Sequence, residues 1–67
     1  MKLVINGEAR ETPGSVRTVI DLLLWLQLKP DRVAVERNRA ISPRSSWPET
    51  GLAENDQLEI VQFVGGG

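Results

Sequence analysis

Short runs of aliphatic and β-branched residues, bounded by turn residues, predict a chain built largely of β-strands. Residues 2–5 form the first run, which Asn6-Gly7 cuts. This pair is typical of a tight hairpin, because both residues of such a turn need positive φ. A polar return strand is expected over residues 8–12, at the edge of the sheet. Further strands are predicted over residues 32–37, 40–41 and 58–64.

One stretch between these strands has the helical period instead. Thr18 followed by Asp21 resembles a capping box, with Ser15 as an alternative N-cap one turn earlier. Lys29 suits the C-terminal end of a helix dipole, and Pro30 forbids continuation, so the helix is expected to end just before it. The apolar residues at helical spacing, which predict one stripe against a sheet, are Val16, Val19, Ile20, Leu23 and Leu26.

The last strand can face the core in two ways. Burying Glu59 would cost far more than exposing a phenylalanine. We therefore place Leu58 and Ile60 in the core, and Val61 and Phe63 outward as a candidate docking surface.

Residues 42–51 hold two prolines and three serines and are predicted to form an ordered loop. Trp47 would anchor this loop, because an indole buries much area while its N–H stays bonded.

The acidic residues Glu54, Asp56 and Glu59 are expected to form a solvated face. The first and last strands are the most apolar, so we expect them side by side and parallel. The resulting fold class is α+β, a mixed four- to five-stranded sheet packed on one main helix, with a domain over residues 1–64 and a glycine tail over 65–67.

Composition removes many functions from consideration. The 67 residues include no Cys, His or Tyr, so disulfides, the usual zinc or haem ligands and triad-type catalysis are absent. A net charge of −1 gives no broad positive field for nucleic acid. No apolar run approaches the ~20 residues of a membrane span, and no signal-peptide pattern is present. We expect a cytoplasmic protein that is not an enzyme and holds no metal.

The α-carboxylate of Gly67 is then the distinctive reactive group. Glycines lack Cβ, so Gly65, Gly66 and Gly67 could enter a channel too narrow for other residues. Fully extended, three residues reach about 10 Å, enough to deliver a carboxylate into a partner's active site. The alternatives are a frayed tail or an expression remnant. The glycines follow a predicted strand without a polar spacer, which disfavours the remnant.

These features together resemble the bacterial sulfur carrier proteins of thiamine biosynthesis, within the ubiquitin-like β-grasp family. The resemblance covers essentially the whole chain. Its most specific part is the ending, where an acidic turn and a strand lead to Phe63-Val64 and the terminal glycines. One departure is Asn38-Arg39, where relatives commonly carry Asn-Gly. Arginine avoids positive φ, so a different turn type is expected there.

The resemblance implies a mechanism and a set of partners. An E1-like adenylating enzyme would activate the Gly67 carboxylate with ATP and magnesium, while the chain itself would bind no cofactor. A sulfur donor protein would then provide sulfur for a thiocarboxylate, and thiazole synthase would accept it. The candidate docking residues are Val61, Phe63 and Val64. Alternatives are a carrier for molybdopterin synthesis or tRNA thiolation, or a β-grasp interaction module whose tail is unused.

Overall fold

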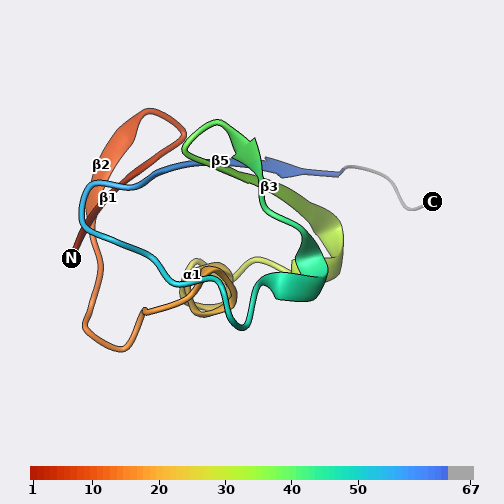
Figure 1. The fold of residues 1–67 in the computed structure, drawn as a ribbon, viewed down its shortest axis with the longest axis horizontal. Coiled ribbons are helices and arrows are strands. Elements are labelled where there is room, and N and C mark those ends of the chain that lie inside the picture. Colours follow the sequence, from red (N-terminus) through yellow and green to blue (C-terminus); the bar gives the residue numbers. More distant parts are fainter. Residues whose placement is uncertain (64–67) are drawn as a thin grey trace.

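The computed structural model describes residues 1–63 and shows a five-stranded mixed sheet packed on one helix, which confirms the predicted fold class (Figure 1). In Figure 1 the helix is seen almost end-on beneath the sheet. The proposed boundary between residues 64 and 65 lies outside the described residues. The elements are β1 (Lys2–Ile5), β2 (Glu8–Glu11), α1 (Val19–Trp25), η1 (Pro30–Arg32), β3 (Val33–Arg37), β4 (Ala40–Ile41), η2 (Arg44–Ser46) and β5 (Gln57–Gln62), where η marks a 3₁₀ turn.

The first and last strands are neighbours inside the sheet, as predicted. The strand order is β2-β1-β5-β3-β4, and β1 runs parallel to β5, with Val4 opposite Gln57. All other neighbours are antiparallel. The polar strand β2 is exposed along its whole length and lies at one edge. Strand β5 is the central strand, and it ends beside β3, at the far end of the molecule from the N-terminus (Figure 1).

Both hairpin turns hold two successive residues at positive φ. Asn6 and Gly7 have φ of 49° and 83°, and Asn38 and Arg39 have φ of 51° and 72°. The expectation of a different turn type at Asn38-Arg39 is therefore wrong. Paired positive φ values match the right-handed twist of the two flanking strands, and this requirement prevails over the preference of arginine.

The asparagine of each turn also ties its hairpin to β5. The side chain of Asn6 accepts a hydrogen bond from the Ile60 amide at 2.8 Å and donates to the Ile60 carbonyl at 3.2 Å. The Asn38 Oδ1 accepts from the Gln57 amide at 2.9 Å. These bonds offset part of the cost of the left-handed backbone and fix β5 on both sides.

Helix α1 begins at the predicted capping box. The Asp21 amide donates to the Thr18 hydroxyl at 3.2 Å, and the Thr18 amide donates to the Asp21 carboxylate at 3.1 Å. Thr18 and not Ser15 is therefore the N-cap. Leu22 and Leu23 are both fully buried against the sheet.

The helix ends earlier than predicted. It stops at Trp25, and Gln27 adopts a left-handed φ of 62°, a common helix ending. Pro30 instead starts η1, and Lys29 lies beyond the last turn of α1, so its predicted interaction with the helix dipole is wrong. No helix within residues 1–63 is long and apolar enough to cross a membrane.

Trp47 anchors the loop, as predicted. Its side chain is 2% exposed, and its indole N–H donates to the Ser42 carbonyl at 2.8 Å. The other core residues come from both sheet and helix and are Leu3, Ile5, Val16, Val19, Leu22, Leu23, Val33, Val35, Leu58 and Ile60.

Asp56 corrects one prediction, because it is buried and does not lie on a solvated face. Its carboxylate accepts hydrogen bonds from Arg37 at 2.9 Å, from Asn38 at 3.0 Å and from the Ala53 amide at 2.8 Å. Burial raises the pKa of Asp56, but these hydrogen bonds outweigh it and hold the pKa below its ordinary value. The acidic turn is thus a structural element that fixes the start of β5.

Candidate functional site

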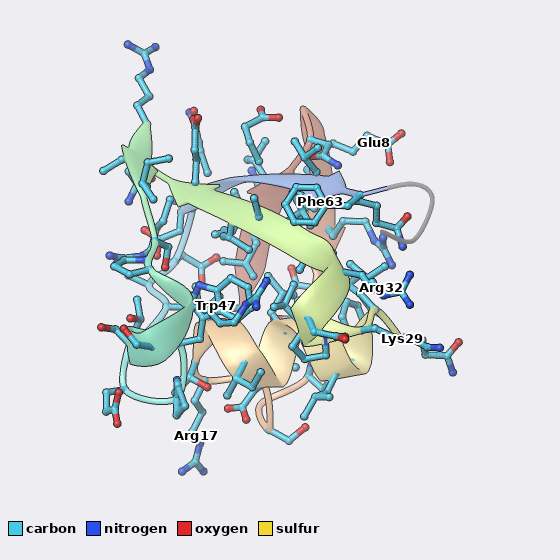
Figure 2. All side chains as sticks on the ribbon, turned by 90° about the vertical axis from the view of Figure 1, so that its right-hand side faces the viewer. Glu8, Arg17, Lys29, Arg32, Trp47 and Phe63 are labelled. Carbon is cyan, nitrogen blue, oxygen red and sulfur yellow. The ribbon has the colours of Figure 1, made fainter. Side chains whose placement is uncertain are left out.

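The outward side of β5 carries the predicted docking residues. Val61 is 59% exposed and Phe63 is 52% exposed, whereas Leu58 and Ile60 are buried. The predicted orientation of the strand is therefore confirmed. Figure 2 looks towards the end of β5 and shows Phe63 at the level of the sheet, with Trp47 between the sheet and the helix.

Pairing with β3 fixes these side chains up to the last described residue. Val61 lies opposite Ala34, and the Phe63 amide donates to the Arg32 carbonyl at 2.7 Å. An antiparallel partner thus holds the backbone of β5 beyond its last strand residue, Gln62. The aromatic ring of Phe63 is therefore presented by a hydrogen-bonded backbone.

Strand β4 extends this surface. Ile41 lies opposite Glu36 and is 75% exposed, the largest exposed fraction among the described large apolar side chains. Because residues that pair across strands share one face, Ile41 lies on the same side of the sheet as Val61 and Phe63. We call Ala34, Ile41, Val61 and Phe63 the outer patch. Sequence analysis missed Ile41 and Ala34, although the period-two pattern of residues 32–37 already placed Ala34 opposite the core-facing valines.

A hollow of about 330 Å³ borders the outer patch, and all four outer-patch residues line it. Pro43 and Trp47 also line it, so the loop with η2 closes one side. Exposed apolar residues gathered around one hollow are typical of a protein interaction surface.

Charged residues also line this hollow. Glu36 and Glu59 lie directly opposite each other on β3 and β5. The Arg44 guanidinium lies 5.7 Å from the centroid of the Trp47 ring. Within residues 1–63, no three metal-ligating side chains gather into a group that could hold a metal ion.

The remaining predicted site residues are Val64, Gly65, Gly66 and Gly67, which lie outside the described residues. Their roles, and the docking role of Val61 and Phe63, stay predictions. The structure shows where the described chain stops, at Phe63, just past the end of β5 and within the outer patch.

The mixed sheet around a single helix, with its two central parallel strands, defines a ubiquitin-like β-grasp protein. The chain belongs to the ThiS family, whose family model matches residues 3–67.

Individual relatives agree with this assignment. The sulfur carrier protein ThiS of Bacillus subtilis is 40% identical over 65 residues, which cover 97% of this chain and 98% of that protein. The crystal structure of a thiamine biosynthesis protein (ThiS) from Geobacter metallireducens superposes with a TM-score of 0.84 at 30% identity, over the full length of both chains.

A second kind of relative is much longer. A thiazole synthase of Paramagnetospirillum magneticum is 51% identical over 67 residues, and a thiazole synthase of Magnetococcus marinus is 42% identical. Each match covers the whole of this chain but only 20% of the thiazole synthase. The chain therefore spans about a fifth of the length of these two relatives.

Proposed function

We propose that this chain is a sulfur carrier of thiamine biosynthesis whose reactive group is the α-carboxylate of Gly67. An E1-like enzyme adenylates this carboxylate with ATP and magnesium, releasing pyrophosphate. A sulfur donor protein then delivers sulfur at the oxidation level of sulfide, which attacks the acyl carbon, displaces AMP and leaves a thiocarboxylate. Thiazole synthase takes the sulfur, and the regenerated carboxylate enters the next cycle. The chain acts in the cytoplasm.

The position of Phe63 is the observation that best supports this mechanism. Its amide donates to the carbonyl of Arg32, the residue just before β3, at 2.7 Å, and Gly67 is the fourth residue after it in the sequence. Four extended residues reach at most about 14 Å. A partner that docks on the outer patch is thus within reach of the Gly67 carboxylate. The tail residues Gly65, Gly66 and Gly67 enter the active site of that partner, while Val61, Phe63 and Val64 dock.

The chemistry of the chain also favours a carrier over an enzyme. The sequence holds no Cys, His or Tyr, so nucleophilic and general-base catalysis would depend on carboxylates, hydroxyls and lysines. A carrier needs none of these, because the partner supplies the activation. In this proposal the chain is a co-substrate and binds no cofactor of its own.

The choice of thiazole synthase as acceptor draws on the long relatives. Two proteins named thiazole synthase contain a segment similar to the whole of this chain. A carrier and its acceptor are natural companions within one polypeptide, because linkage raises their effective concentration. This likeness favours thiazole synthase over acceptors in molybdopterin synthesis or tRNA thiolation.

Intact mass spectrometry tests the proposal. The 67-residue chain is incubated with the adenylating enzyme of thiamine biosynthesis, ATP, magnesium and a sulfide source. We expect one carboxylate oxygen to be replaced by sulfur, at Gly67. Addition of thiazole synthase and its other substrates should then return the original mass.

Two controls are needed, one for the site of loading and one for the activity of the enzyme. A chain lacking Gly67 should keep its fold and gain no sulfur. If the intact chain gains none, with an enzyme proven active on another carrier, the activating enzymes of the molybdopterin and tRNA pathways are tried next. Loading by one of these would assign the other pathway, and loading by none would leave an interaction module with an unused tail.

A further inference from the structure

Glu36 and Glu59 form an unfavourable pair on the outer face of the sheet. They lie directly opposite each other on β3 and β5, and both are exposed. Like charges directly opposite each other on neighbouring strands destabilise a sheet. Within residues 1–63, neither carboxylate forms an ion pair.

Four other carboxylates of the described chain have close partners, whereas Glu8 and Glu49, which do not oppose another acid across the sheet, have none. Asp56 is paired with Arg37 at 2.9 Å, and Asp21 accepts two backbone amides at the start of α1. Glu54 accepts from the Lys2 amide at 3.0 Å, and Glu11 lies 3.4 Å from the N-terminal amine. The fold thus provides donors for these carboxylates but leaves two opposed glutamates on one face without a cation.

The two glutamates also adjoin the outer patch. Ile41 continues their row across β4, and Val61 follows two residues after Glu59 on β5. Both carboxylates line the same 330 Å³ hollow as the outer patch. Arg44 is the one basic residue among those that line this hollow in the described chain, and its guanidinium faces the Trp47 ring. The hollow therefore combines apolar walls with a net negative charge.

We propose that the outer patch and the Glu36–Glu59 pair together form the docking site for the adenylating enzyme, through a surface that carries an arginine or lysine among apolar side chains. This inference rests on the function proposed above and adds the chemistry of the partner. A cation between the two carboxylates forms charge-assisted hydrogen bonds to both and removes their repulsion. The apolar side chains around it exclude water from these bonds.

Neutralising both glutamates tests the inference, because it should change stability and docking in opposite directions. The double variant Glu36→Gln/Glu59→Gln keeps the size of both side chains. We expect an unfolding midpoint in urea at or above that of the unaltered protein. In the loading assay we expect kcat/KM to fall at least tenfold, through a higher KM. The dependence of kcat/KM on salt should also become weaker.

Glu49→Gln is the matched control. Glu49 is exposed in the loop after η2 and does not line the hollow, so its loss should leave loading unchanged. Two results would overturn the inference while the sulfur carrier function stands: a double variant loaded as efficiently as the unaltered protein, or one that loses loading together with its fold. If the unaltered protein itself is not loaded, the proposed function fails, and the inference fails with it.

Discussion

The two sides of strand β5 lie in different surroundings although their residues alternate along one backbone. On the helix side, Leu58 is 1% exposed and Ile60 is 8% exposed. On the outer side, Val61 and Phe63 keep more than half of their surface exposed. Buried and exposed side chains thus alternate along one strand, and the exposed apolar ones are those proposed to dock. Substitutions on the two sides should therefore affect different measurements.

The carboxylates of β5 and its neighbours also differ between a buried and an exposed position. At the start of β5 the carboxylate of Asp56 is buried and saturated with donors. On the outer side, Glu36 and Glu59 are exposed and oppose each other. The Asp56 carboxylate is thus satisfied within the chain, whereas the outer pair has no cation partner within residues 1–63. The proposed docking site therefore depends on the outer pair and not on Asp56.

The largest effect is expected on the helix side of β5. Leu58→Ala removes a fully buried side chain and should cost about 2–5 kcal/mol of unfolding free energy. A domain of this size has only about 3–10 kcal/mol in total, so much of the variant should be unfolded. Val61→Ala, three residues along, should cost less than about 1 kcal/mol. Urea denaturation followed by circular dichroism measures both, and equal losses would contradict the division between the two sides.

Asp56 should produce the next largest effect. Asp56→Asn removes charge-assisted hydrogen bonds and should cost about 1.5–3 kcal/mol, measured by urea denaturation at pH 7. The matched outer-side variant Glu59→Gln should cost nothing or stabilise the protein, because it removes a repulsion. A loss of similar size in Glu59→Gln would mean that Glu59 is satisfied within the fold.

The same carboxylate sets the response to acid. The pKa of Asp56 is held below its ordinary value of 3.8 in the folded protein. Its contribution to stability is therefore complete above pH 3.8 and is lost as the pH falls through the lower folded pKa. Asp21 shares this direction, because the amides of Arg17 and Thr18 lower its pKa. Unfolding free energy should fall in this acid range, less steeply in Asp56→Asn, and an unchanged slope would contradict the prediction.

Phe63→Ala should have the opposite balance to Leu58→Ala, with little loss of stability and a large loss of binding. About half of the ring is already in solvent, so the loss of stability should be under about 1 kcal/mol. Exposed aromatic residues are frequent hot spots in interfaces, and the Kd for the adenylating enzyme should rise tenfold or more. Titration calorimetry measures the Kd, and thermal unfolding provides the control. A large drop in stability with unchanged binding would place Phe63 among the core residues.

Much of the fold could be predicted from the sequence because local signals agreed with one another. The capping box at Thr18, the Asn6-Gly7 turn and the cost of burying Glu59 each depend on neighbouring residues. These signals located the helix start, the first hairpin and the exposed side of β5. The parallel pairing of β1 and β5 followed from their apolar composition.

The errors arose where distant residues decide the structure. Asp56 was expected to be solvated, but Arg37 and Asn38, far away in the sequence, provide its donors. Helix α1 was extended towards Pro30, because Lys29 and Pro30 are typical of a helix end, whereas the chain already leaves the helix at the left-handed Gln27. Ile41 was not recognised as part of the site, since a two-residue strand has no periodicity to read. The residues that share a face across strands are set by the register of strand pairing. This register cannot be read from any single segment of the sequence.

The smallest change in stability is expected at the turn between β3 and β4, which leads into Ile41. A substitution there tests whether backbone strain in the turn can be relieved without affecting docking on the outer patch. Arg39 holds a φ of 72°, which costs a side chain with Cβ but not glycine. Arg39→Gly should therefore stabilise the protein by about 0.5–1 kcal/mol, although glycine also adds entropy to the unfolded chain. Gly7→Ala, at the matching position of the first hairpin, should destabilise it by a similar amount, since φ there is 83°. Urea denaturation of both variants tests the pair, and the Kd for the adenylating enzyme should stay unchanged in Arg39→Gly. A weaker complex would show that Arg39 contributes to docking and that the interface extends beyond the outer patch to the β3–β4 turn.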